Sequence, residues 1–549
     1  MQISDKLSVQ YILQYLKIHN IENIVLCPGS RNAPFIISVA EDKYFKVFSI
    51  VDERTAGFVA LGIARNVNKP VAVICTSGSA VLNLASAILE AYNQEVPLLV
   101  LTADRPLKDI GIGENQTFKQ ASVFNNYIKY QEIIDENEPI SAIESKLSYI
   151  HKYLFSSLYL GPVHINFHFN EPLYNKVKVL ENTLSKCVLN IDNQLIIINK
   201  FNNLKYIKVL IYISSMRFQM DEIELLEQLI QDKNVVVFSE ITSNIKGKSI
   251  YQNIDLIIDK VSELDYPDCF ITIGGHMISK KIRTFLKNNP QIAHIDIHSQ
   301  PRHWNFFSNN FTEIISDNRS AIKVLQSNLK PNEASFVSSW RNLTEHSISY
   351  QKSFLGRAVF SEFHICNQLI QCFKQNSKVF WGNSSMIRYA NWSLLNENPT
   401  IQHYANRGVS GIEGVLATAI GYQWSDKSQK VYCVLGDLSA LYESNSFWAG
   451  TQLEDITILV LNNYGGQIFN NINKNLTECE QKLISTPHNL TLSNISQMYK
   501  YQYIKTNNLK KFTNNIKSYL NLKGRIIIEI FFNEKSHLEW NSYFEQFKM

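Results

Sequence analysis

The chain has 549 residues, more than one hydrophobic core usually holds, so three or four domains are expected. Hydrophobic residues make up 45% of the chain and aromatic residues 11%, which excludes a largely disordered protein. The 53 basic and 49 acidic side chains leave a net charge of only +4, which argues against a dedicated nucleic-acid-binding protein.

The eight cysteines are scattered and form no CxxC pair, a pattern typical of free thiols in a reducing compartment. The first residues contain no signal-peptide core. No apolar run reaches the roughly 18 residues that a membrane span needs. We therefore expect a cytoplasmic, multi-domain globular protein with no membrane span.

Residues 1–178 alternate helix and strand patterns. Apolar residues at helical spacing predict a helix over 8–19. Continuous apolar runs predict buried strands at 23–27, 71–75, 98–102 and 163–167. Buried strands separated by helices indicate a parallel sheet covered on both faces.

Two further α/β blocks are expected. A weakly patterned linker at 180–200 precedes the second block, residues 190–335, with strands predicted at 208–213, 235–238, 269–273 and 292–297. A polar connector at 330–355 precedes the third block, residues 355–549, with strands predicted at 378–381, 430–435, 456–461 and 525–531. The prediction is an α/β fold of three successive doubly wound parallel-sheet domains.

Chemistry-bearing residues follow the predicted strands at their carboxyl ends, where open parallel sheets bind ligands. Gly436-Asp437 ends one strand of the third block, and Asn462-Asn463 ends the next. The Asp437 carboxylate, the Asn463 amide oxygen and the Gly465 carbonyl form a hard-oxygen set that suits octahedral Mg²⁺. A turn followed by a helix cap would explain the pair of motifs equally well.

Gly-Asp followed by Asn-Asn at this spacing resembles the diphosphate–metal motif of thiamine diphosphate enzymes. The resemblance implies thiamine diphosphate as cofactor, held through Mg²⁺ or Mn²⁺ on Asp437, Asn463 and Gly465. It also implies a catalytic glutamate from the N-terminal domain. Glu53 is the candidate because it opens an apolar, Gly- and Ala-rich helix, and capping of that helix is the alternative role.

Further motifs resemble the MenD family, the 2-succinyl-5-enolpyruvyl-6-hydroxy-3-cyclohexene-1-carboxylate synthases of the menaquinone pathway. They run in order from about residue 8 to the C-terminus and include Cys27-Pro-Gly-Ser-Arg-Asn32, Leu101-Thr-Ala-Asp-Arg-Pro106, Gly113-Glu-Asn-Gln116 and Asn406-Arg-Gly-Val-Ser-Gly411. Ser79 and Glu413 stand where the family pattern has Thr and Asp, which puts local geometry in doubt.

The resemblance implies a reaction and an assembly. The family decarboxylates 2-oxoglutarate and adds the succinyl unit to isochorismate, which gives the product in its name. It implies a homodimer as the minimal active unit, paired further into a homotetramer. In such a dimer, the N-terminal domain of one chain faces the C-terminal domain of another.

Both implied substrates are anionic, so the arginines of the strand-end loops are candidates for binding their carboxylates in bidentate pairs. These arginines are Arg31, Arg105, Arg388 and Arg407. Their expected hydrogen-bonding partners are Ser30, Gln116, Asn383 and Ser384. Which arginine serves the donor and which the acceptor stays open, as does the role of the basic pair Lys280 and Lys281.

The resemblance also implies further cofactor contacts in the third block. Ile412 matches the bulky aliphatic residue that holds the cofactor bent, and the other expected contacts are Ser410, Gln467 and Ile468. Ile468 and Phe469 are expected to form apolar walls. Ordinary core packing is an equal explanation for these three apolar residues.

The middle block carries fewer signals. It contains Ile271-Thr-Ile-Gly-Gly-His276 but no GxGxxG after a strand, so nucleotide binding is not expected there. His298 and His303 have no third metal ligand at a suitable spacing and are expected to be structural.

Two other functions stay open. A different 2-oxoacid carboligase, such as an acetolactate-synthase-like enzyme, would share the cofactor motifs, but small neutral acceptors do not need four arginines. A catalytically dead scaffold would be expected to lack Glu53, Asp437 or Asn463, and the chain has all three. Binding of thiamine diphosphate with Mg²⁺ would separate an enzyme from a scaffold.

Overall fold

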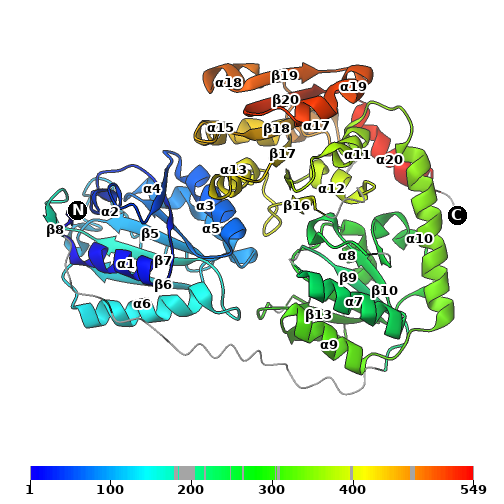
Figure 1. The fold of residues 1–549 in the computed structure, drawn as a ribbon, viewed down its shortest axis with the longest axis horizontal. Helices are drawn as coiled ribbons and strands as arrows, with labels where there is room; N and C mark the ends of the chain where they lie inside the picture. The colour runs from blue at the N-terminus through cyan, green and yellow to red at the C-terminus, as the bar shows by residue number, and fades with distance from the viewer. Residues whose placement is uncertain are drawn as a thin grey trace. The chain divides into compact units, whose positions relative to one another are not determined.

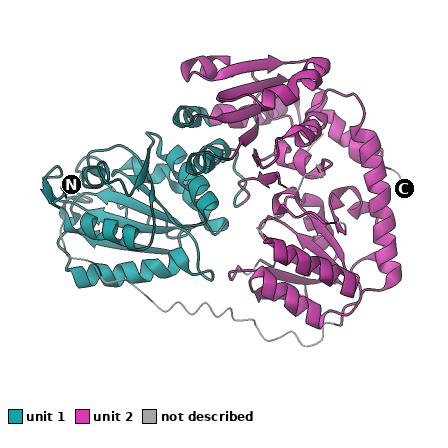
Figure 2. Cartoon of the chain, viewed as in Figure 1, with its two compact units in different colours: residues 1–193, 408–428, 443–453 teal, residues 194–407, 429–442, 454–549 magenta. Residues whose placement is uncertain are grey.

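The computed structural model describes residues 2–178, 184, 205–215, 218–247, 249–262, 265–302, 304–305, 309–395, 400–469, 476–533 and 535–547. Two compact units are coloured in Figure 2. Unit 1 comprises Met1–Asn193, Gly408–Ser428 and Glu443–Leu453. Unit 2 comprises Gln194–Arg407, Gln429–Tyr442 and Glu454–Met549. Nearly all of the linker expected at 180–200, and also His303, lie outside the described residues.

Unit 1 contains a parallel sheet of six strands in the order β3-β2-β4-β5-β7-β6. Figure 1 labels β5, β6 and β7 of this sheet. The strands are β2 (Asn23–Leu26), β3 (Lys46–Ser49), β4 (Val71–Cys75), β5 (Leu98–Asp104), β6 (Tyr130–Asp135) and β7 (Val163–His168). Its main helices are α1 (Leu7–Ile18), α2 (Ala33–Val39), α3 (Glu53–Val67), α5 (Ala85–Asn93) and α6 (Ile140–Phe155). Helices α1, α2 and α6 share one hydrophobic core with the sheet. A short antiparallel ribbon pairs β1 (Gln2–Ser4) with β8 (Lys176–Lys178).

Helix α13 (Val415–Ser425) also belongs to unit 1 and packs across α3 at two glycines. A Cβ atom on Gly62 would lie 2.0 Å from the carbonyl oxygen of Thr418. A Cβ atom on Gly421 would lie 2.0 Å from the carbonyl oxygen of Val59. Only glycine permits such an approach of two backbones. The crossing therefore fixes α13 against the helix that begins at Glu53.

Unit 2 contains two parallel sheets, and the first has the strand order β11-β10-β9-β12-β13-β14. Its strands are β9 (Val209–Ile213), β10 (Val236–Ser239), β11 (Ile250–Tyr251), β12 (Cys269–Ile273), β13 (Ala293–His298) and β14 (Phe311–Ile315). Its helices include α7 (Met220–Lys233), α8 (Lys280–Asn288) and α9 (Asn318–Asn328). The loops after β9 and β12 are joined, because Ser214 donates a hydrogen bond to the Gly275 carbonyl over 2.7 Å.

The second sheet of unit 2 has the order β16-β15-β17-β18-β20-β19. Its strands are β15 (Lys378–Trp381), β16 (Gln402–Tyr404), β17 (Val431–Gly436), β18 (Ile456–Asn462), β19 (Gln502–Thr506) and β20 (Arg525–Phe531). Its helices are α11 (Glu362–Cys372), α12 (Ser385–Trp392), α14 (Asp437–Tyr442), α17 (Glu478–Ser485), α18 (Ser493–Met498), α19 (Leu509–Leu520) and α20 (Glu539–Glu545).

The prediction of an α/β fold with three parallel sheets is confirmed. The prediction of a polar connector at 330–355 is wrong, because most of this segment forms helix α10 (Ala334–Leu355). Phe336, Trp340 and Phe354 are buried along one side of α10, so an apolar stripe underlies its polar composition. Within the described residues, no helix combines the length and apolarity that a membrane crossing needs.

The sheet of unit 1 and the second sheet of unit 2 share one strand order. In each, the first strand lies between the second and the third, so the chain reverses direction across the sheet there. The reversal falls between β2 and β4 in one sheet and between β15 and β17 in the other. Open α/β sheets bind ligands at such reversal points. Strand β17 ends at Gly436, so Asp437 directly follows it at one of these reversal points.

Candidate active site

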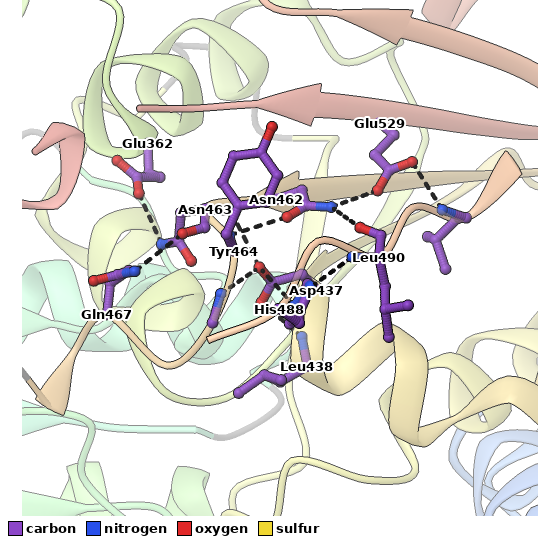
Figure 3. A network of polar contacts seen from close by, with 12 residues as sticks. Glu362, Asp437, Leu438, Asn462, Asn463, Tyr464, Gln467, His488, Leu490 and Glu529 are labelled. Atoms are coloured by element: carbon purple, nitrogen blue, oxygen red, sulfur yellow. Dashed lines mark hydrogen bonds and ion pairs between the residues drawn. The ribbon is translucent and has the colours of Figure 1, made fainter. Parts of the chain in front are cut away.

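The carboxylate of Asp437 joins the loops that follow β17 and β18 at the carboxyl ends of these strands (Figure 3). Its Oδ2 accepts backbone N–H groups from Asn463 at 3.1 Å and Gly465 at 2.9 Å. Its Oδ1 accepts the N–H of Leu438 at 2.7 Å, at the start of α14. The loop after β18 is thus held against the end of β17, and the three predicted metal ligands meet.

The amide of Asn463 is oriented by a carboxylate that the sequence analysis missed. Its Nδ2 donates to Oε1 of Glu362, 2.8 Å away, so its Oδ1 is directed away from Glu362. Glu362 is fully buried at the start of α11, and this burial raises the pKa of its carboxyl group. In the sequence it reads as an ordinary acidic residue in the first turn of a helix, after the N-cap Ser361.

The backbone after Asn463 has an unusual shape that glycine permits. Tyr464 has φ 63° and Gly465 has φ 143°. A Cβ atom on Gly465 would lie 2.7 Å from the carbonyl oxygen of Ser485. His488, which the sequence analysis also missed, places Nε2 3.4 Å from Oδ2 of Asp437. Ser485 and His488 therefore pack against the loop after β18 and hold it in place.

The residues present fit a hard divalent cation and a diphosphate. Asp437, Asn463 and Gly465 offer a carboxylate, an amide oxygen and a carbonyl oxygen, the ligand types that Mg²⁺ prefers. A Cβ atom on Gly436 would meet no atom within 4 Å, so open space lies beside the end of β17. Among the described residues there is no cluster of three His, Cys, Asp or Glu side chains suited to a metal.

Glu53 is the first residue of α3, but it does not cap that helix. The cap is Asp52, whose Oδ1 accepts the N–H of Arg54 at 3.0 Å. Oε2 of Glu53 instead accepts a hydrogen bond from Nδ2 of Asn83 at 3.0 Å. The capping role considered as the alternative for Glu53 thus belongs to its neighbour.

The segment 408–414 precedes α13 and carries two predicted cofactor contacts. Ser410 has φ 63°, and the side chain of Ile412 is 42% exposed. Core packing does not account for an Ile that is this exposed. Upstream, Glu90 accepts the N–H groups of Gly408 and Val409, each at 2.7 Å.

Downstream of the segment, Glu443 accepts the N–H groups of Leu416 and Ala417, each at 3.1 Å. Glu443 is 2% exposed, and burial raises the pKa of its carboxyl group to about 7. These backbone N–H bonds and the charge of Arg54 lower that pKa, but they do not offset the burial.

The raised pKa predicts a pH dependence of stability. The folded state binds the proton of Glu443 more tightly than the unfolded state, whose ordinary pKa is 4.5. This group's contribution is therefore fully present below pH 4.5 and is lost as the pH rises towards 7. In the wild type, the free energy of unfolding should therefore fall by about 3 kcal/mol at most as the pH rises. In Glu443→Gln this decrease should be absent. Urea denaturation between pH 4.5 and 7.5 measures it, and the exposed Glu345→Gln should keep the wild-type slope.

Two family models match the chain. The model described as "Thiamine pyrophosphate enzyme, N-terminal TPP binding domain" matches residues 8–123, and the C-terminal TPP binding domain matches residues 382–530. A Flavobacterium johnsoniae protein named 2-succinyl-5-enolpyruvyl-6-hydroxy-3-cyclohexene-1-carboxylate synthase is 33% identical over 541 residues, covering 95% of each chain. The chain belongs to the MenD family.

Other relatives with the same name agree in length and identity. The Flavobacterium psychrophilum protein is 35% identical over 547 residues, covering 95% of each chain. The Bacteroides thetaiotaomicron protein is 30% identical over 574 residues, covering 99% of each chain. The predicted resemblance is confirmed, and thiamine diphosphate is the cofactor of this MenD-family chain.

In unit 1, two of the predicted substrate arginines lie close together. Burial, followed by the charge of Arg105, lowers the pKa of Arg31. Arg31 donates to the carbonyl of Phe169 at 3.3 Å and pairs with Glu171 at 3.1 Å. The charge of Arg31 is therefore already paired with the carboxylate of Glu171. Nearby, the hydroxyls of Ser30 and Tyr174 lie 2.9 Å apart.

Gln116 lies in the loop between β5 and β6, with φ 57°. Its side chain faces Gly78, where an added Cβ atom would lie 3.3 Å from its Cγ. Gly78 belongs to the loop after β4, so Gln116 reaches the strand ends at which the sheet of unit 1 reverses.

In unit 2, Arg388 lines a cavity of about 770 Å³. Its guanidinium donates to the Ser384 carbonyl, and burial with the charge of Arg283 lowers its pKa. Ile468, Lys280 and Lys281 line the same cavity. Lys281 also pairs with Asp259 at 2.5 Å, and Asp255 and Asp259 line the cavity as well.

Arg407 is buried and makes different contacts. Its Nη1 donates to Oδ1 of Asn383 at 3.0 Å, and the Asn383 amide donates to the Asn406 carbonyl at 2.7 Å. Gln467 donates to the carbonyl of Asn463 at 3.1 Å, while Phe469 is 40% exposed. Arg407, Asn383 and Gln467 thus stabilise the strand-end loops themselves.

Proposed function

We propose that the protein decarboxylates 2-oxoglutarate with thiamine diphosphate and adds the succinyl unit to isochorismate, in menaquinone biosynthesis. The product is the compound in the name of its relatives. The observation that carries the proposal is the end-to-end match to proteins with that name, 33% identical over 95% of each chain. The hard-oxygen set at Asp437 supports it.

The chain's own residues have distinct roles in this proposal. The bound cofactor supplies the electron sink for decarboxylation. Asp437, Asn463 and Gly465 would hold Mg²⁺, or Mn²⁺ in its place, and the hydrogen bond from Nδ2 of Asn463 to Glu362 leaves the Asn463 Oδ1 available for the ion. When the cofactor is bound, Glu53 would accept a hydrogen bond from it, and Ile412 would offer it an apolar support.

The cavity lined by Arg388 supports an anionic substrate. Arg388 makes no ion pair within 4 Å among the described residues, and its neighbours Lys280 and Arg283 add positive charge, which the cavity-lining Asp255 offsets in part. A dicarboxylate such as 2-oxoglutarate would meet these cations with its distal group. Acetolactate-synthase-like chemistry, the runner-up, uses a donor without that group.

Replacing Arg388 with Ala should therefore change donor preference. With 2-oxoglutarate, kcat/KM should fall because a charge-assisted contact is lost. The fall should correspond to a loss of about 2–3 kcal/mol in transition-state binding. With pyruvate, which has no distal carboxylate, the loss should be several-fold smaller. Steady-state kinetics with both donors measures the difference. The exposed Arg341→Ala serves as control, and equal losses for both donors would contradict the assignment.

The proposed reaction is tested by an assay of purified protein with 2-oxoglutarate, isochorismate, thiamine diphosphate and Mg²⁺. The expected result is loss of isochorismate together with CO₂ release. Pyruvate should be a poor donor in the same assay. Efficient turnover of pyruvate without isochorismate would favour the runner-up, and failure to bind the cofactor would favour a scaffold.

We further propose a homodimer as the minimal active unit, paired into a homotetramer in the cytoplasm. The proposed domains are 1–178, which carries Glu53, a central domain at 190–335, and 355–549, which carries the metal ligands. One cofactor touches the first domain of one chain and the third domain of another. Size-exclusion chromatography with light scattering tests the assembly.

A further inference from the structure

We propose that Glu90 and Glu443 are positioning residues that hold the segment 408–414 in the shape in which Ser410 and Ile412 meet the cofactor. The inference rests on the proposed cofactor roles of Ser410 and Ile412. Neither glutamate follows a predicted strand or belongs to a recognised motif. They act from α5 and from the start of α15 (Ser444–Gly450), and each anchors one end of the segment.

The upstream anchor is Glu90, near the end of α5 and 1% exposed. Its Oε1 accepts the N–H of Gly408 and its Oε2 accepts the N–H of Val409, both at 2.7 Å. A Cβ atom on residue 408 would lie 2.8 Å from the carbonyl oxygen of Glu90, so glycine is needed for this approach. Two short, charge-assisted bonds from one carboxylate fix both position and direction of the chain.

The downstream anchor is Glu443, which accepts the N–H groups of Leu416 and Ala417 in the first turn of α13. These donors have no partners within the helix, and the helix dipole adds positive charge there. Just before them, Gly414 has φ 85°, and a Cβ atom on it would lie 2.3 Å from the ring of Phe58. The backbone at the C-terminal end of the segment is therefore held as firmly as the backbone at its N-terminal end.

Between the anchors, the segment has features that the fold alone does not favour. Val409 is 43% exposed and Ile412 is 42% exposed, although both side chains are apolar. Ser410 adopts a left-handed conformation that is unfavourable for a residue with a side chain. Such strain persists when the surroundings over-determine the backbone, and it gathers at ligand sites. Two anchors that each hold two consecutive N–H groups provide that over-determination.

A purely structural role makes a different prediction. Buried glutamates that only stabilise the fold would lower the melting temperature when replaced, with no change in cofactor affinity of the folded protein. Glu240 offers a matched control in unit 2. It is 1% exposed and accepts two consecutive N–H groups, from Ile278 and from Ser279, outside the segment.

The experiment compares full-length Glu90→Gln, Glu443→Gln and Glu240→Gln with the wild type. The first readout is hydrogen exchange of residues 408–417 without cofactor. We expect exchange at least about tenfold faster in the first two variants, with β4 and β5 unchanged. The second readout is calorimetric titration with thiamine diphosphate and Mg²⁺, where the dissociation constant should rise about tenfold or more in the same two variants. Glu240→Gln should match the wild type in both.

Unchanged exchange in the segment would overturn the anchoring role, and faster exchange with wild-type cofactor affinity would overturn the positioning role. Glu90→Asp and Glu443→Asp keep the charge and should recover part of the affinity, and they replace any Gln variant that does not fold. A wild-type protein that binds no thiamine diphosphate would refute the proposed function, and the exchange result would still decide the anchoring.

Discussion

Replacing Asp437 with Ala is expected to abolish turnover and to weaken binding of thiamine diphosphate with Mg²⁺ beyond detection by calorimetry. The carboxylate is the one charged member of the proposed ligand set, and it also accepts the N–H groups of Leu438, Asn463 and Gly465. Its loss removes a ligand and releases the loop that presents the other two. Loss of residues that merely orient ligands costs ~10–100-fold in metal affinity, so this loss should exceed ~100-fold.

Asp455→Ala is the matched control for this variant. Asp455 lies at the opposite end of β18, where it accepts hydrogen bonds from Lys430 at 2.7 Å and from the Gly524 N–H at 3.2 Å. Its removal should lower the melting temperature and leave cofactor affinity near that of the wild type. Near-wild-type cofactor affinity in Asp437→Ala would refute the metal assignment, and excess Mg²⁺ should not restore its activity.

Mixing Glu53→Gln chains with Asp437→Ala chains should restore activity, although each variant alone should be inactive. If each site takes Glu53 from one chain and Asp437 from another, a mixed dimer has one site with both lesions and one with neither. Random pairing then gives about a quarter of wild-type activity. The measurement is specific activity after subunit exchange, with exchange verified by native mass spectrometry.

A chain that carries both lesions provides the complementary control. Mixed one-to-one with wild-type chains, it should leave about a quarter of wild-type activity if sites are shared between chains. It should leave about half if each chain builds its own site. No recovery in the first mixture, together with half activity in the second, would overturn the shared-site proposal.

The twelve strands that the sequence predicted are all present. Among the described residues of the three six-stranded sheets, the strands that it missed are the two edge strands of each sheet; it also missed the short ribbon of β1 and β8. The central strand β5 is buried at every position, and so is β18, so each reads as a continuous apolar run. The edge strands β3 and β19 contain mostly exposed or half-buried residues. Because their side chains are largely polar, they do not form the continuous apolar run from which the other strands were predicted.

The candidate site was predictable where its residues follow strands. Asp437 and Asn463 directly follow neighbouring strands, and parallel strands place their carboxyl ends at one edge of the sheet. The residues that support them were not predictable. Glu362 contacts Asn463 from 101 positions away, and Glu90 contacts Gly408 from 318 positions away. Such contacts depend on tertiary packing, and an isolated glutamate in a helix gives no sign of them.

The shared strand order of the first and third sheets has an evolutionary consequence. It is the pattern expected when one ancestral α/β unit is duplicated, and the residues of the middle sheet, which has a different strand order, come between the two repeats in the sequence. The loops after β4 and β17 are then counterparts: the third strand of each sheet leads into Thr76-Ser-Gly-Ser79 in one copy and Gly436-Asp437 in the other. An acidic residue, Asp437, is present at only one of these counterparts, so the two loops differ in the charge that they offer to a ligand.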